Sequence, residues 1–166
     1  MSRIHTIVAR GAIAGLLASG IAAPAFATQG SGVTVTNIVN GHFGTLDIKT
    51  ENNKVGHWGM ILKTKDDTDV GSDSLTLAGG GSTGWHSHPA AVMVTVVEGS
   101  INWYNGSNAM CPPTTYSAGQ SFVEDAFIIH NVINASQGNQ AKFIAIRVNP
   151  TGVPFRIDQP KPGACH

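Results

Sequence analysis

The sequence of 166 residues carries little charge, and neither sign predominates. Its 10 Lys and Arg residues balance 10 Asp and Glu residues, and charged residues make up only 12% of the chain. Without a basic excess the chain has no bulk attraction for a phosphate backbone or an anionic membrane, so we expect no nucleic-acid partner. Low charge combined with 42% hydrophobic residues also excludes intrinsic disorder. The length predicts one compact domain.

No apolar run in the sequence reaches the roughly 20 residues that span a bilayer. The apolar stretch 11–23 follows Arg3 and Arg10 and leads to Ala25-Phe26-Ala27. Basic residues, a short apolar stretch and small residues in this order are typical of a secretory signal peptide. We therefore predict a signal peptide at residues 1–27, cleavage after Ala27, and a periplasmic or secreted domain 28–166. No stable membrane anchor is expected after cleavage.

Cysteine is scarce, since the chain has only Cys111 and Cys165. In an oxidising compartment, two cysteines most simply form one disulfide. Such a bond would tie the C-terminal tail to the middle of the chain and stabilise the fold by roughly 3 to 4 kcal/mol in the chain-entropy description. Two free thiols are the alternative.

The sequence after residue 27 contains no convincing helical periodicity. Segments with alternating or β-branched residues are instead separated by runs rich in Gly, Asn, Asp and Ser. The segments are 33–39, 45–48, 57–62, 74–77, 91–97, 101–104, 120–123, 127–133 and 142–148, and the separators are 40–41, 66–71, 79–84, 105–108 and 135–139. This spacing predicts an antiparallel sandwich or barrel of about ten strands. Four prolines after residue 149 predict an irregular surface tail over 149–166.

Most apolar side chains in these segments are expected to pack in a core. The positions expected in the core or in packing between strands are Val92, Val94, Val96, Phe143, Ile144 and Ile146. The larger aromatic residues, Trp58, Trp103, Phe122 and Phe127, are interpreted as packing residues as well. Lining of a ligand cavity is their alternative role, because barrel interiors are filled by such side chains with or without a ligand.

Three histidines form a candidate metal site. Gly84-Trp85-His86-Ser87-His88-Pro89 spaces two imidazoles by two residues, and His130 follows in a later β-rich run. A spacing of two places His86 and His88 on the same face of a strand. Imidazole binds Fe, Mn, Zn, Ni and Cu, and three imidazoles leave coordination positions open for water or substrate. The pattern predicts a divalent transition metal of open identity, while His42, His57 and His166 are interpreted as surface or packing residues.

These residues resemble the two sequence motifs of the cupin family. The first motif is matched by Gly80, His86, His88 and Gly99, and the second by Ser117-Ala118-Gly119, His130 and Asn134. Ten residues separate Gly119 from His130, which is longer than the short form of the second motif. The resemblance covers about 73–148 and implies a single-domain, all-β double-stranded β-helix, or jelly-roll barrel, with the three histidines as metal ligands.

A narrower resemblance concerns small exported bacterial cupins of unassigned activity. It rests on segments 82–89, 119–124, 156–158 and 162–165, together with the region of Cys111. The resemblance implies that Cys111 and Cys165 are paired. It names no substrate.

The chain departs from the first cupin motif at its glutamate, whose position falls on Val92, or on Met93 with the alternative spacing. Neither residue can replace a carboxylate ligand. Glu124, six residues before His130, is the candidate replacement, as fourth ligand or as general base. Asp125 is a weaker choice, and a solvated turn carboxylate is the alternative interpretation of Glu124. Three histidines with a carboxylate would suit Mn or Fe, whereas three histidines alone would suit Zn, Cu, Ni or Fe.

Three functions follow from this site. The first is a metal-dependent cupin dioxygenase or isomerase that acts on a small enolic or phenolic molecule, with Glu124 as a catalytic residue or ligand. The second is a non-catalytic periplasmic protein that binds a metal or a small ligand, which loss of the motif glutamate favours. The third is a structural domain with vestigial histidines. A homodimer formed through an open sheet edge is an additional expectation.

Overall fold

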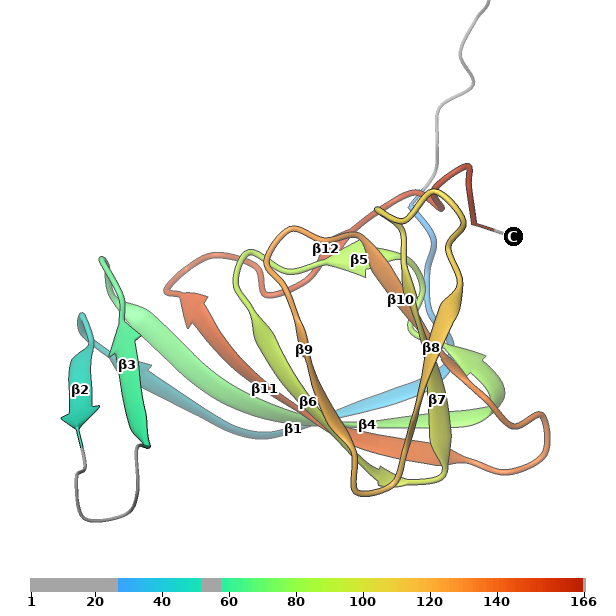
Figure 1. Ribbon diagram of the computed structural model, residues 1–166, viewed down its shortest axis with the longest axis horizontal. Coiled ribbons are helices and arrows are strands. Elements are labelled where there is room, and N and C mark those ends of the chain that lie inside the picture. Colours follow the sequence, from blue (N-terminus) through green and yellow to red (C-terminus); the bar gives the residue numbers. More distant parts are fainter. Residues whose placement is uncertain (1–26, 52–57, 166) are drawn as a thin grey trace, which may run out of the picture.

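The computed structural model describes residues 27–51 and 58–165 (Figure 1). The predicted signal peptide up to residue 26, together with His57 and His166, lies outside the described residues. The described residues form strands and no helix, and accordingly no described helix is long and apolar enough to cross a membrane. The predicted fold class, an all-β jelly-roll barrel in a single domain, is confirmed.

Twelve strands are present in the described part of the chain, against about ten predicted. They are β1 (Ser31–Phe43), β2 (Asp47–Glu51), β3 (Gly59–Lys63), β4 (Thr68–Ser82), β5 (His86–Ser87), β6 (Val92–Glu98), β7 (Ser100–Asn105), β8 (Pro113–Ser117), β9 (Ser121–Glu124), β10 (His130–Asn134), β11 (Ala141–Pro150) and β12 (Ile157–Asp158). Ten of them belong to one sheet, and β2 and β3 form a separate hairpin beside the barrel (Figure 1).

The ten-stranded sheet wraps around so that two halves face each other. One half has the order β1-β4-β11-β6-β9, and the other has the order β8-β7-β10-β5-β12. The pairing of Ile133 in β10 with Ser82 at the end of β4 joins them. All neighbouring strands in the described residues are antiparallel, as short strands linked by tight turns require.

Strand alternation fills the barrel interior. Val92, Val94 and Val96 on β6 are each 1% exposed, whereas Met93 between them is 49% exposed. Ala145 and Phe143 on β11 lie opposite Val94 and Val96 and complete the same packed layer. The predicted core positions on β6 and Phe143 are therefore confirmed. The prediction for Ile146 on β11 is wrong. Successive side chains of a strand point to opposite faces, and Ile146 faces outward with 40% exposure.

Several predicted turns lie inside strands. Residues 79–82 and 68–71 belong to β4, and Asn40-Gly41 belongs to β1. Residues 79–81 lie at an irregularity of the β1–β4 ladder, between the pairs Val33–Leu77 and Ser31–Ser82, and Gly80 keeps a positive φ of 67°. The rest of the ladder holds 68–71 in extended pairing with 40–43. Cross-strand pairing thus overrides the local preference of Gly, Asn and Asp for turns.

Part of one predicted strand is absent, two predicted packing residues are exposed, and one observed strand was not predicted. Residues 127–129 are not part of a strand: Phe127 has a φ of 61° and is 68% exposed, and Trp58 is 59% exposed, so neither packs in the core. Strand β8 was missed because it begins with Pro113, which is tolerated at the first residue of an edge strand.

The tail is anchored rather than irregular along its whole length. Its short strand β12 pairs with β5, and Cys165 forms a disulfide with Cys111, so the predicted pairing of the two cysteines is confirmed. The disulfide packs with Trp85, and Tyr104 and Ile129 lie against this second, smaller core.

Candidate metal centre

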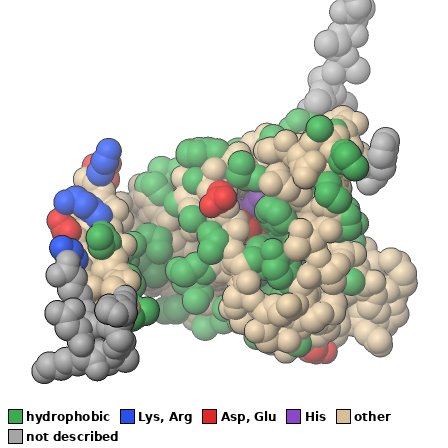
Figure 2. Space-filling model, viewed as in Figure 1, with side chains coloured by type: hydrophobic (Ala, Val, Ile, Leu, Met, Phe, Trp, Pro, Cys, Tyr) green, Lys and Arg blue, Asp and Glu red, His purple; other side chains and the backbone are tan. Residues whose placement is uncertain are grey.

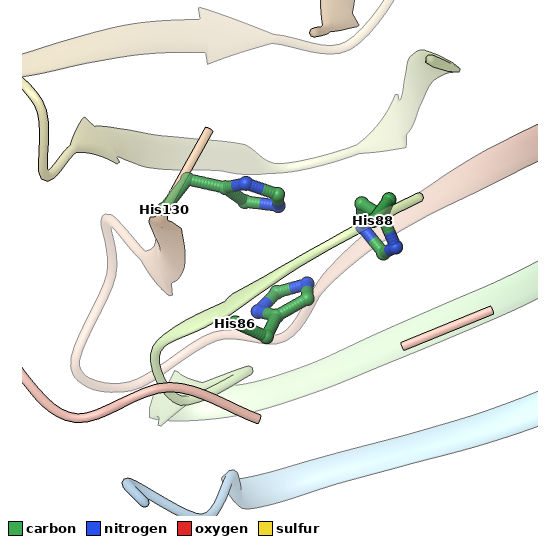
Figure 3. A group of neighbouring side chains, drawn as sticks. All are labelled: His86, His88 and His130. Atoms are coloured by element: carbon green, nitrogen blue, oxygen red, sulfur yellow. The ribbon is translucent and has the colours of Figure 1, made fainter. Parts of the chain in front are cut away.

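The rings of the three predicted histidines point toward one another (Figure 3). His86 lies in β5, His88 directly follows β5, and His130 begins β10. His86 and His130 are cross-strand partners, and their ring centroids are 4.3 Å apart. The ring of His88 completes the group at 4.9 Å from His86 and 5.1 Å from His130.

The backbone turns into the segment with His86 and His88 at Gly84, a position that only glycine fits. Gly84 has a φ of +73°, and a Cβ atom built on it would lie 2.3 Å from the carbonyl oxygen of Thr28. A side chain at this position would therefore combine an unfavourable backbone conformation with a steric clash. The carbonyl oxygen of Gly84 in turn lies 2.8 Å from Nδ1 of His86.

Backbone carbonyl groups fix the orientation of all three rings. Nδ1 of His86 faces the oxygen of Gly84, Nδ1 of His88 lies 2.9 Å from the oxygen of Phe155, and Nδ1 of His130 lies 2.9 Å from the oxygen of Ile128. A carbonyl oxygen only accepts, so each Nδ1 carries the proton and each Nε2 has a free lone pair in the neutral ring. One potential ligand atom from each histidine lies within 4.8 Å of the other two.

Glu124 extends its carboxylate into the same space from β9, which belongs to the other half of the sheet. It ends β9, is 4% exposed and is the cross-strand partner of Val92. Val92 is the position of the missing motif glutamate, and side chains directly opposite each other on paired strands have Cβ atoms about 4.5 to 5.5 Å apart. The carboxylate oxygens of Glu124 lie 3.3 Å from Nε2 of His88 and 3.2 Å from Nε2 of His130. Glu124 is therefore not a solvated turn residue, whereas Asp125 is exposed.

The arrangement of these groups fits a cation. With the Nδ1 protons used by carbonyl oxygens, the lone pairs of Nε2 on His88 and His130 face a carboxylate that also only accepts. Nε2 of His130 is buried and has no hydrogen-bond partner. Buried polar atoms without a partner are rare and costly. A positive centre between the three groups, either an extra proton or a metal ion, removes this repulsion.

The surroundings of His86 keep this ligand in its metal-binding form. Burial, followed by the nearby His130, Arg156 and His88, lowers the pKa of His86 to about 2. Burial alone would raise the pKa of Glu124, but a second proton on the neighbouring His130 or His88, which would then donate to the carboxylate, holds this pKa below its ordinary value. A metal ion between these groups would act on Glu124 in the same way. A neutral imidazole and an ionised carboxylate are the forms that bind metals.

The site opens into a cavity of about 260 Å³ inside the barrel. Its walls are largely apolar and include Leu75, Val92, Val132, Phe143 and Phe155. Figure 2 shows histidine and acidic side chains deep in an opening that is bordered by hydrophobic side chains. Of the other charged residues in the wall, Asp73 is paired with Arg147 at 2.8 Å, and Arg156 is paired with Asp158 at 2.6 Å.

The C-terminal tail contributes to this site, which the sequence did not predict. The ring of Phe155 stacks on His88 with a centroid distance of 4.3 Å and an interplanar angle of 22°, and its carbonyl oxygen orients the same imidazole. Four prolines suggested an irregular segment. The available signal was the alternation Phe155-Arg156-Ile157-Asp158 between Pro154 and Pro160, which is typical of a short strand.

Comparison with known proteins supports the cupin superfamily. Residues 74–147, somewhat under half of the chain, match the cupin domain family. A cupin-like protein of Thermotoga maritima is similar in structure, with a TM-score of 0.52, 16% identity, and coverage of 78% of this chain and 77% of that chain. Peruvianin-I, a cysteine peptidase from Thevetia peruviana latex, has a TM-score of 0.50 and 20% identity, with coverage of 78% and 68%.

These similarities establish the fold and leave the activity open. Both identities are low, and cupin-type barrels carry unrelated activities. No curated protein sequence matches significantly. The function must therefore be argued from the site itself.

Proposed function

We propose that this single-domain cupin barrel binds one divalent transition metal through His86, His88 and His130, with Glu124 as a fourth ligand. The observation that carries the proposal is the buried, mutually repulsive set of acceptors, with three Nε2 lone pairs and one carboxylate directed at a common space. The metal is Fe, Mn, Zn, Ni or Cu. Three histidines with one carboxylate favour Mn or Fe within this group.

We further propose that the cavity receives a small enolic or phenolic molecule. A bound metal would supply Lewis acidity toward an anionic oxygen and, if redox-active, electron exchange with dioxygen. The chain itself contributes the apolar walls formed by residues such as Val132 and Phe143, which exclude water from a flat, hydrophobic substrate. Oxidation by dioxygen or isomerisation are the two reactions proposed for this site.

Glu124 determines whether the protein is an enzyme. Released from the metal, its carboxylate could accept the hydroxyl proton of the substrate, because it lies beside His88 and His130 at the cavity wall. If Glu124 stays bound as a ligand, the other acid in the described cavity wall, Asp73, is engaged by Arg147. This pairing supports the second candidate, a non-catalytic protein that holds a metal or small ligand.

Export and self-association complete the proposal. The signal-like sequence before residue 27 and a disulfide together support a periplasmic or secreted location. Among the described strands, β1 pairs only with β4, and this open edge supports association of two copies.

Metal analysis by mass spectrometry tests the central proposal. The full-length chain is expressed, allowed to be exported and oxidised, and compared with His86→Ala and His42→Ala. The His42 side chain is 60% exposed and is the matched control. We expect close to one metal ion per chain in the wild type and in His42→Ala, and a large loss in His86→Ala. Absence of metal from the wild type, even after incubation with all five ions, would overturn the proposal.

Turnover separates the two candidates. The metal-loaded protein is mixed with 1,3-diketones and phenols, and oxygen uptake and product formation are recorded. Uptake that requires His130 supports the enzyme. Thermal stabilisation by the same compounds without conversion supports the binding protein.

A further inference from the structure

The C-terminal tail makes direct contact with a metal-binding histidine. Phe155 covers one face of the His88 ring, and its carbonyl oxygen accepts the Nδ1 proton. The neighbouring Arg156 donates through Nη2 to the carbonyl oxygen of Thr83 at 2.8 Å. Partners of this kind set the tautomer and direction of a metal ligand.

The tail also holds the backbone of the histidine segment. Strand β5 has only two residues, and β12 pairs with it so that Asp158 lies opposite His86 and Ile157 opposite Ser87. The backbone amide of Gln159 donates to the oxygen of Trp85 at 2.9 Å, and its side chain donates to Oγ of Ser87 at 3.1 Å. The segment that carries two ligands therefore lies between β10 and the tail.

The disulfide lies in the small core that joins these parts. Cys111 and Cys165 are 6% and 4% exposed and pack with Trp85, which is 4% exposed, while Ile129 lies against them. Trp85 directly precedes His86, and Ile129 directly precedes His130. The crosslink spans 54 residues and gives the described tail a second covalent link to the barrel, in addition to the backbone that continues from β11.

We propose that the Cys111–Cys165 disulfide positions the metal ligands by fastening the tail against them, so that metal affinity depends on the redox state of the chain. This inference rests on the proposed metal site. A dithiol reductant would transfer two electrons and two protons, cleave the S–S bond into two thiols, and itself become a disulfide. The freed tail then leaves His88 without its carbonyl partner for part of the time, and β5 without β12.

Coupling of this kind operates in both directions. If the fastened tail raises metal affinity, a bound metal must hold the tail in place more firmly. Because both cysteines are buried, a reductant reaches the sulfur atoms only when the tail detaches. Metal binding should therefore slow reduction of the disulfide.

The test compares metal affinity in the full-length, exported protein with and without the crosslink. Zinc and cobalt dissociation constants are measured by competition with a chromophoric chelator, and the cobalt absorption spectrum reports ligand geometry. We expect the double variant Cys111→Ser and Cys165→Ser to bind at least tenfold more weakly, in the range found when partners of metal ligands are lost. Val94→Ala, a destabilising change in the main core that leaves the disulfide and β12 unchanged, is the control and should keep its affinity within about threefold.

Two further measurements keep the inference testable if the double variant does not fold. Phe155→Ala retains the disulfide and should bind metal several-fold more weakly. Reduction of the wild type by a water-soluble phosphine, which takes oxygen from water to become a phosphine oxide, should be slower with metal bound.

Three results would overturn this inference alone, provided that the wild type binds metal. They are an unchanged affinity in the double variant, an equal loss of affinity in Val94→Ala, and a reduction rate that does not depend on metal. Failure of the oxidised wild type to bind metal overturns the proposed function itself.

Discussion

One cross-strand pair, Val92 and Glu124, determines how the site obtains its carboxylate. Because the two side chains leave neighbouring strands opposite each other, a carboxylate from either strand can reach the histidines. We predict that Glu124→Val weakens metal binding at least tenfold, and that Val92→Glu combined with Glu124→Val recovers most of the loss. Isothermal titration with Mn or Fe measures both effects.

The matched control for this exchange is Val94→Glu combined with Glu124→Val. Val94 faces the same interior, but its cross-strand partner on β9 is Phe122, one step farther from the site. This control should not recover metal binding. Full affinity in Glu124→Val alone would show that the carboxylate is not a ligand and would favour a site of three histidines.

The metal-free protein should lose stability in acid because of His86. Its pKa is near 6.5 in the unfolded chain and is lowered to about 2 in the fold, so between these values the unfolded state binds the extra proton. Stability is therefore complete above pH 6.5 and decreases as the pH falls, by at most about 1.4 kcal/mol per pH unit for this one group. The lowered pKa of Glu124 adds a further loss below about pH 4.5.

Urea unfolding in the presence of a chelator, at intervals from pH 8 to pH 5, measures this dependence. Above pH 5 the contribution of Glu124 is small, so His86→Gln should flatten the curve. A curve of unchanged slope in His86→Gln would assign the acid sensitivity to other groups.

At the scale of strands, local pattern predicted most elements but not their ends. Residues 91–97 and 142–148 were recognised because Val94 and Phe143 belong to strongly apolar segments, and observed β6 and β11 agree within a few residues. Gly79, Gly80 and Gly81 suggested a turn, yet they lie within β4, and the backbone amide of Gly80 pairs with the distant carbonyl oxygen of Ser136. The sequence alone does not report such pairing.

In the metal site too, local sequence predicts some features, whereas others depend on long-range contacts. A spacing of two residues was enough to place His86 and His88 on one face, because strand geometry is local. The approach of Phe155 to His88 depends on a disulfide and on a two-residue strand, so no local pattern could predict it. Glu124 was chosen because the motif glutamate is missing and Glu124 lies six residues before His130, but its position opposite Val92 required the sheet register.

Close packing between the tail and the end of β7 gives a prediction at this scale. A Cβ atom built on Gly106 would lie 2.6 Å from Cγ of Pro162 and 2.9 Å from the carbonyl oxygen of Ile129. We expect Gly106→Ala to destabilise the protein by about 1 to 3 kcal/mol, as overpacking does. Urea unfolding tests this against Gly138→Ala, where nothing lies within 4 Å of the added atom and a change within about 0.5 kcal/mol is expected. Equal effects of the two changes would contradict tight packing at Gly106.

At the scale of the whole molecule, the buried polar site lowers the stability of the metal-free protein, and metal binding would remove this loss. Three histidines and a glutamate, each no more than 5% exposed, occupy space that an ordinary barrel fills with apolar side chains. A ligand that binds only the folded chain stabilises it by about 2.7 kcal/mol at 100 times its dissociation constant. For a domain of this size we therefore expect the melting temperature to rise by about 5 to 10 °C.

Differential scanning calorimetry with and without a chelator measures this rise, and two variants locate its origin. His42→Ala should shift as the wild type does, because His42 lies on the surface and pairs with Asp69. His130→Ala should lose most of the shift, because the variant removes a proposed ligand whose Nε2 atom is buried without a hydrogen-bond partner. A shift of wild-type size in His130→Ala would mean that the metal binds elsewhere, and the acceptors inside the barrel would then need another cation, such as a shared proton.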